Sequence, residues 1–400
     1  MRKYRTLCLF LTSVVSLSLL LVYRNEYNRL HYVLEVFDFF GQPCNFSELF
    51  KNDFIHQYKD WGPIPTWQQN EDMYTYSAFL INNSQVKVIA LQSTKKEVAR
   101  VCYLWFEDRE TPVVGEFKSF LIEGNAAYRQ WIYYYYCSLS TNKSTPYAVS
   151  FVIKKRNKTF EHMKKIMITS NIKSKDLFNI TICVSPTLFS KKLLLEFISF
   201  HELIGIENFI FYLHDIPYNV SKLVSMLSPK LGIQSTFYIW NYPKLESNLS
   251  RLIVEKECLL RTFGKTVNTI TLEIDEYIIP FYSHSLSRML SEYNLKRKNG
   301  RLSFPLQKFC LENENPHQPI ALQNFNAVVD NSTIVRYMYK SIDNDSTLIT
   351  QMIEDTASIH KYIKCTQTPI KVHEDRSITR FRKDFVRSTL VQLLIHDNIK

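Results

Sequence analysis

The sequence predicts an α/β protein with a mainly parallel sheet covered by helices on both faces, preceded by a smaller β-rich domain and an N-terminal membrane anchor. Three observations predict it: an uncharged apolar run behind a basic N-terminus, period-two alternation through residues 74–151, and alternating strand-like and helix-like segments from Ile180 onward. The expected divisions are a cytosolic tail and transmembrane anchor at 1–24, a stem at 25–65, a β-rich domain with a connector at 66–175, and an α/β domain at 176–400.

The N-terminus is typical of an uncleaved signal anchor. Arg2, Lys3 and Arg5 precede residues 7–22, which are apolar and uncharged. A cleaved signal peptide is the alternative, but no small-x-small cleavage site follows the run. Basic residues on the near side keep the N-terminus in the cytosol. We therefore expect a single-pass type II membrane protein of the Golgi or ER, with the main part of the chain in the lumen.

Glycosylation sequons and cysteines agree with a lumenal location. Asn-x-Ser/Thr occurs at Asn45, Asn82, Asn142, Asn157, Asn179, Asn219, Asn248, Asn331 and Asn344. Of eight cysteines, Cys8 lies in the apolar run and seven remain. They form no Cys-x-x-Cys pair, which argues against a zinc ribbon. In an oxidising lumen some should pair, and an odd number leaves at least one free or linked to another chain.

Composition excludes some partners. With 46% hydrophobic and 22% charged residues the chain resembles an ordinary folded protein. The net charge of +11 falls to +7 once the four basic residues of segment 1–24 are subtracted. No dense basic stripe follows, so nucleic acid is not an expected partner.

The segment from 74 to 151 predicts a small β-rich domain. Tyr74, Tyr76, Ala78 and Leu80 alternate with other residues, as the two faces of a strand require. Residues 154–175 are basic and poorly periodic, and they are predicted to be a connector. We expect this domain to have a structural role.

From Ile180 the pattern predicts strands and helices in turn. The expected elements are strands at 180–184, 208–213 and 236–240 and helices at 191–204, 220–227 and 249–263, with Gly205 ending the first helix. Such alternation favours a parallel sheet, whose ligands lie outside the carboxyl ends of the strands. Asp215, Glu273 and Asp275 all fall at such ends.

The segment from Thr269 to Pro280 carries the strongest functional signal. As one strand that ends before Pro280, it would place Glu273 and Asp275 on the same face. Two neighbouring carboxylates need a cation, and a hard divalent ion that also binds phosphates would supply it. The alternative is a strand end with solvated acids. The chain has only 8 glycines and no phosphate-binding glycine loop, so a metal is the expected holder of any nucleotide phosphates.

Glu273–Tyr277 resembles the Asp-x-Asp-Glu-Phe element of glycosyltransferase family 92, with Glu273 in place of the first Asp. Cys258 lies on the preceding helical segment, as a cysteine does in that family. Phe197–Tyr212 is similar to the family's helix-Gly-strand block. The resemblance covers roughly residues 180–373.

The resemblance implies a GT-A-like, Rossmann-type fold and an inverting, metal-dependent hexosyltransferase. The family's best-known donor is UDP-galactose and its best-known acceptor is fucose on N-glycans. On this hypothesis Asp215, Glu273 and Asp275 bind the nucleotide sugar, and Mn²⁺ or another divalent cation bridges its diphosphate. Segments around His360 and His373 resemble the family's late histidines, and His373 is the candidate that completes the metal shell with Asp275 and Glu273. Glu312 is the candidate base that takes the acceptor's proton.

Two other classes remain open. The chain could be a degenerate relative that binds glycans or partners without catalysis, as the Glu273 substitution suggests. It could also be a structural membrane glycoprotein without a ligand. Manganese-dependent binding of UDP separates the enzyme from both.

Overall fold

The computed structural model describes residues 15–16, 18–19, 66–70, 73–82, 84–95, 100–139, 144–154, 163–170, 177–186, 190–214, 218–241, 247–294, 300–311, 315, 318–329, 334–340, 350–352, 355–365 and 371–397. By internal contacts the chain divides into residues 1–58 and residues 59–400. The anchor predicted within 1–24 and the stem at 25–65 lie outside the described residues, apart from four helical residues at 15–19. No helix in the described ranges is both long enough and apolar enough to cross a membrane.

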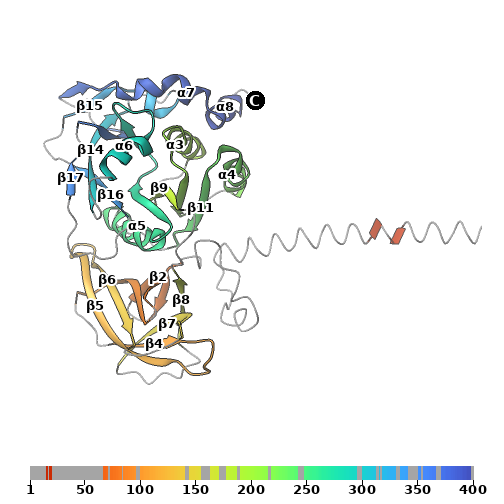
Figure 1. Ribbon diagram of the computed structural model, residues 1–400, viewed down its shortest axis with the longest axis vertical. Helices are drawn as coiled ribbons and strands as arrows, with labels where there is room; N and C mark the ends of the chain where they lie inside the picture. The colour runs from red at the N-terminus through yellow and green to blue at the C-terminus, as the bar shows by residue number, and fades with distance from the viewer. Residues whose placement is uncertain are drawn as a thin grey trace, which may run out of the picture. The chain divides into compact units, whose positions relative to one another are not determined.

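The first part of the larger unit is a closed β-barrel (Figure 1). Its strands are β2 (Met73–Asn82), β3 (Gln85–Gln92), β4 (Arg100–Trp105), β5 (Val113–Asn125), β6 (Gln130–Ser138), β7 (Ala148–Ile153) and β8 (Ile166–Ser170), and the short strand β1 (Gln68–Asn70) pairs with β2 in addition. The barrel strands pair in the order β2-β3-β6-β5-β4-β7-β8, and β8 returns to β2 in parallel, with Ile168 opposite Ala78. The segment that we predicted to be a connector thus contains the strand that closes the barrel.

The second part is built on an 11-stranded mixed sheet. Four strands lie parallel in the order β11-β10-β9-β12: β9 (Phe178–Val184), β10 (Asn208–Leu213), β11 (Gln234–Ile239) and β12 (Thr266–Leu272). They are connected by helices α3 (Lys191–Leu203), α4 (Tyr218–Leu231) and α5 (Ser247–Thr262). Gly205 follows α3 with φ of 91°, and its N–H donates to the carbonyl of Glu202, so glycine ends this helix as predicted.

The remaining strands run in both directions. They are β13 (Glu276–Pro280), β14 (Arg301–Cys310), β15 (Asn326–Val328), β16 (Val335–Lys340), β17 (Thr350–Met352), β18 (Ala357–Ile363) and β19 (Val372–Glu374). Helix α6 (Leu286–Asn294), the 3-10 turns η3 (Ile320–Leu322) and η4 (Ser377–Phe381), and helices α7 (Arg382–Arg387) and α8 (Thr389–Asp397) complete the described elements.

The predicted fold class is therefore wrong. In the second sheet five strand pairs are parallel and five are antiparallel. The chain before it is a closed barrel, so strands dominate the described residues. The error has a physical cause, because hydrophobic alternation indicates which face of a strand is buried but not the direction of its neighbour.

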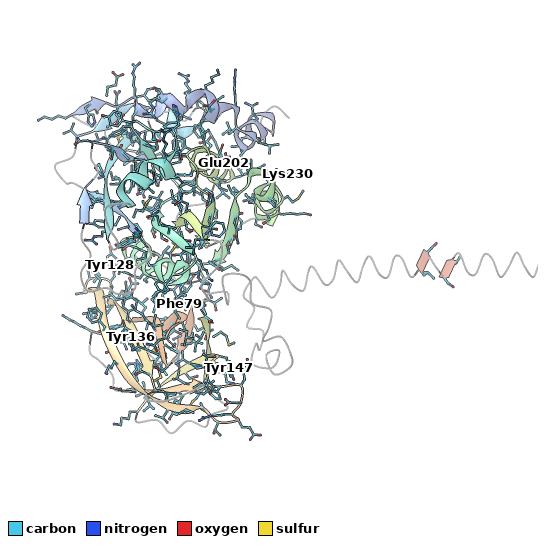
Figure 2. The ribbon with its side chains drawn as sticks, viewed as in Figure 1. Phe79, Tyr128, Tyr136, Tyr147, Glu202 and Lys230 are labelled. Atoms are coloured by element: carbon cyan, nitrogen blue, oxygen red, sulfur yellow. A yellow bond between two sulfur atoms is a disulfide. The ribbon has the colours of Figure 1, made fainter. Side chains whose placement is uncertain are left out.

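Side chains of the parallel strands alternate between two cores. Ile182, Phe211 and Leu272 face the core that contains α3 and α4. Cys183 and Tyr212 face the opposite core, which contains α5 and residues of barrel strands β2, β3 and β6. Phe79 of β2, labelled in Figure 2, lies 5.4 Å from the guanidinium of Arg261 on α5, measured to the ring centroid. The barrel thus packs on one face of the sheet.

Three disulfides lie within the described chain. Cys102 pairs with Cys137 between barrel strands, Cys183 with Cys258 between β9 and α5, and Cys310 with Cys365 at the ends of β14 and β18. These pairs use six of the seven cysteines outside the apolar run, and Cys44 lies outside the described residues.

Candidate functional site

The acidic segment forms a turn and is not one continuous strand. Strand β12 ends at Leu272 and β13 begins at Glu276, so Glu273, Ile274 and Asp275 make the connection. The N–H of Glu276 donates to the carbonyl of Glu273 at 3.0 Å, and Ser185 N–H donates to the carbonyl of Leu272 at 2.9 Å. The acidic turn, which we define as residues 273–276, therefore lies at the carboxyl end of the parallel strands.

Strand β18 pairs with β13 and contacts the acidic turn. The N–H of Tyr362 donates to the carbonyl of Asp275 at 3.1 Å, and Lys361 lies directly opposite Glu276 on the antiparallel pair β13–β18. The Lys361 ammonium donates to the carboxylate of Glu273. It also lies 3.6 Å from Glu276 Oε1 and 3.9 Å from Asp275 Oδ1. Burial alone would lower the pKa of Lys361, but the three carboxylates raise it above its ordinary value, so the amine stays charged.

A second cation, Arg336, contacts the acidic turn. Arg336 of β16 donates from Nε to both carboxylate oxygens of Glu276 at 3.1 Å, and one terminal nitrogen is 2.5 Å from Oε1. The same terminal nitrogen is 3.6 Å from Glu273. Glu276 is fully buried and Arg336 nearly so. A bidentate contact between a guanidinium and a carboxylate offsets the desolvation cost of burying both charges.

Asp275 is the least satisfied carboxylate of the turn. Its Oδ1 is buried and accepts no hydrogen bond. Burial raises the pKa of Asp275 to about 7, with Lys361 opposing the shift and Glu276 and Glu273 adding to it. An uncommitted carboxylate oxygen with this environment fits a hard divalent cation. Glu273 and Glu276 fit less well, because Lys361 and Arg336 already engage them.

The two late histidines have different positions. His360 on β18 is fully buried, and its Nε2 lies 3.3 Å from Asp375 Oδ2. Burial lowers the pKa of His360, so the imidazole is neutral near pH 7. Although burial acts to raise the pKa of Asp375, the contact with His360 and the hydrogen bond from the backbone N–H of Ser377 lower it overall. His373 is exposed on β19, opposite Ala327 of the short strand β15.

The predicted ligands do not form a closed metal shell in the described structure. No group of three or more His, Cys, Asp and Glu side chains is placed to hold a metal ion within the described ranges. Asp215 and Glu312, our candidates for nucleotide-sugar binding and for the base, lie outside the described residues. Their roles, like that of His373, remain predictions.

Most predicted sequons also lie outside the described side chains. Those of Asn45, Asn142, Asn157, Asn219, Asn248, Asn331 and Asn344 are not described. Asn82 is exposed at the end of β2, whereas Asn179 is partly buried on β9. Of these two side chains, Asn82 is the more exposed.

Sequence reasoning missed Arg336, Lys361 and Asp375. Arg336 and Lys361 lie far along the chain from their carboxylate partners, and an isolated basic residue within a strand gives no local signal of a pair. Asp375 follows β19, and only the folded chain brings it to His360. Lys361 could have been found, because it follows His360 in a segment that resembles one of the family's late histidine segments.

Comparisons with solved structures give only weak likenesses. A putative glucose-1-phosphate thymidylyltransferase from Bacillus anthracis is 14% identical with a TM-score of 0.25, over 40% of this chain and 72% of that chain. A nucleoside-diphosphate-sugar pyrophosphorylase from Vibrio cholerae RC9 is 12% identical with a TM-score of 0.22, over 52% of this chain and 100% of that chain. These TM-scores are too low to bear on fold or function. No curated protein sequence matches the chain.

The family comparison is decisive. The sequence model of glycosyltransferase family 92 matches residues 178–389, more than half of the chain. The match begins at the first residue of β9 and ends at the first residue of α8, so it includes the acidic turn, Arg336 and Lys361. It confirms the resemblance that the sequence motifs indicated. The chain therefore belongs to glycosyltransferase family 92, whose enzymes transfer a sugar from a nucleotide sugar to a glycan acceptor.

Proposed function

We propose that this glycosyltransferase transfers a hexose, with galactose from UDP-galactose as the leading donor, to a glycan acceptor such as fucose on N-glycans. The observation that supports the proposal is the acidic turn at the carboxyl end of the parallel strands, within the region that matches the family. Ligands of such sheets bind at this edge.

The proposed reaction is a single displacement with inversion. The acceptor hydroxyl oxygen attacks the anomeric carbon, the bond from that carbon to the UDP oxygen breaks, and UDP leaves with the electron pair. The proton of the hydroxyl passes to a carboxylate base, for which Glu312 remains the candidate. Groups that offset the charge developing on the leaving diphosphate lower the barrier most.

A divalent cation such as Mn²⁺, bound mainly through Asp275 with Glu273 contributing less, is the proposed cofactor. Such an ion supplies positive charge to the diphosphate when it is bound. The support is the buried Oδ1 of Asp275, which accepts no hydrogen bond. Asp275 thus orients the ion, while Arg336 keeps Glu276 in place behind it.

We also propose that the enzyme works in the lumen of the Golgi or the ER. The support is the three disulfides, one of which links β9 to α5 beside the sheet. Disulfides persist in oxidising compartments and are rare in the cytosol.

The test is a panel of nucleotide sugars incubated with the purified full-length chain and fucosylated N-glycans, with and without Mn²⁺. We expect UDP release and a hexosylated product with UDP-galactose, and loss of both in Asp275→Asn. Turnover with another donor only would replace UDP-galactose in the proposal.

A non-catalytic glycan- or partner-binding protein is the second candidate. It is favoured by the neutralisation of Glu273 and Glu276 by the chain's own Lys361 and Arg336. Binding of fucosylated glycans with no turnover from any nucleotide sugar would support this candidate over the enzyme.

A further inference from the structure

The ammonium of Lys361 occupies the centre of the acidic turn. It contacts Glu273 directly and lies within 3.9 Å of carboxylate oxygens from both Asp275 and Glu276. Its position follows from the pairing of β13 with β18, which places Lys361 opposite Glu276. One amine therefore lies close to every carboxylate of the turn.

The two cations at the turn differ in how firmly they are held. Arg336 is 7% exposed, and two of its nitrogens donate to the fully buried carboxylate of Glu276. The side chain of Lys361 is 17% exposed and ends in a single charged group on a flexible four-carbon stem. Lys361 is thus the cation that can leave the turn without breaking the buried pair beneath it.

Charge favours the departure of Lys361 when a metal ion binds beside Asp275. With all three carboxylates ionised, as they must be when a cation binds, the two cations leave the turn with a net charge of −1, and Glu273 and Glu276 are already engaged by Lys361 and Arg336. A divalent ion beside Asp275 would meet the repulsion of an ammonium 3.9 Å from the oxygen that it needs. A nucleoside diphosphate brings negative charge of its own to the ion, which favours binding of the ion at the turn over the ammonium.

We propose that Lys361 is an internal counterion of the acidic turn, which competes with the divalent cation and leaves the turn when cation and diphosphate bind. The proposal rests on the proposed metal-dependent use of a nucleotide sugar. On this basis the free protein takes up the divalent ion weakly, and the diphosphate strengthens that uptake. Lys361 acts through the cation and is a positioning residue.

The first test is calorimetric titration of the full-length chain with MnCl₂ alone, without nucleotide. Lys361→Met keeps most of the stem and removes the charge, and we expect Mn²⁺ to bind on the order of tenfold more tightly than to the wild type. Lys383→Met, on the exposed face of α7, is the matched control and should leave the affinity unchanged. Affinity that is equal to or weaker than that of the wild type in a folded Lys361→Met protein overturns the proposal.

The second test needs only the wild type, so it stands even if the variant fails to fold. Reductive methylation with mass spectrometry measures how accessible each amine is. We expect modification of Lys361 to rise several-fold when MnCl₂ and UDP are added, with Lys383 unchanged. Unchanged modification of Lys361 at millimolar MnCl₂ and UDP overturns the proposal.

The outcomes separate this proposal from the proposed function. If the wild type transfers sugar but Lys361→Met does not change the Mn²⁺ affinity, the counterion proposal is wrong and the proposed enzymatic function stands. Tighter Mn²⁺ binding by Lys361→Met, with no transfer from any donor, supports the counterion and removes the enzymatic function.

Discussion

The indole rings of Trp67 and Trp240 meet edge to face, with their centroids 5.4 Å apart. Trp67 precedes the first barrel strand, whereas Trp240 follows β11 of the mixed sheet. The backbone N–H of Trp67 donates to Asn241 Oδ1 at 2.8 Å, and Tyr76 of β2 packs against both rings. This aromatic cluster makes the barrel and the sheet share a core.

We therefore expect the barrel and the sheet to unfold together. Trp67→Ala should destabilise the protein by about 3–5 kcal/mol, because it leaves a cavity among buried aromatic rings. Urea unfolding followed by tryptophan fluorescence and by circular dichroism should still give one coincident transition. Tyr128→Ala, at the exposed β5–β6 turn labelled in Figure 2, is the control and should change stability by no more than about 0.5 kcal/mol. Two separate transitions in the wild type would contradict the shared core.

The acidic turn predicts opposite outcomes for two conservative variants. Asp275→Asn keeps the shape of the side chain but removes the charge, so manganese-dependent binding of UDP should be lost. Glu273→Asp should keep or improve that binding, because the shorter side chain loosens the contact with Lys361 that holds the ammonium in the turn. Calorimetric titration of UDP with MnCl₂ into the wild type and both variants measures this. Wild-type binding by Asp275→Asn would show that the metal assignment is wrong.

The buried pair of Arg336 and Glu276 should be costly to break. Arg336→Met leaves a fully buried carboxylate without its main partner, so we expect a loss of about 3–5 kcal/mol in the free energy of unfolding. Arg376→Met removes a comparable contact to Glu374 whose two side chains are 68% and 56% exposed, and it should cost less than about 1 kcal/mol. Urea midpoints of both variants test the contrast, and equal losses would contradict it.

Buried His201 predicts a loss of stability in acid. Burial lowers its pKa from 6.5 to about 3, so below pH 6.5 the unfolded chain takes up a proton that the folded chain does not. The contribution of His201 is complete above pH 6.5 and is lost as the pH falls towards 3. His201→Gln should flatten this pH profile in part, since buried His360 contributes in the same direction. An unchanged slope of urea midpoints against pH in His201→Gln would refute the assignment.

The disulfide pattern can be checked on the purified full-length protein. A non-reducing digest should contain peptides that link Cys102 to Cys137, Cys183 to Cys258 and Cys310 to Cys365. Replacing both Cys183 and Cys258 with serine should cost about 2–4 kcal/mol, because their bond spans 75 residues of sequence. A linkage of Cys44 to any of these six cysteines would contradict the pattern.

Local sequence determined the individual elements of the second part of the chain. The helix expected at 191–204 is α3 (Lys191–Leu203), and the strand expected at 208–213 is β10 (Asn208–Leu213). Hydrophobic period and the glycine cap suffice here, since they act between residues only a few positions apart. The family motifs are likewise short segments, and the family assignment made from them is confirmed.

Only the tertiary structure decided the strand directions, the barrel and the charges at the site. The acidic segment looked like one strand, but a turn at residues 273–275 lets β13 pair with β18 instead. The partners of that turn, Arg336 and Lys361, come from 60 and 88 residues away. The barrel closes because β8 returns to β2 across the whole domain. Such contacts depend on long-range pairing, which the periodicity of a single segment does not encode.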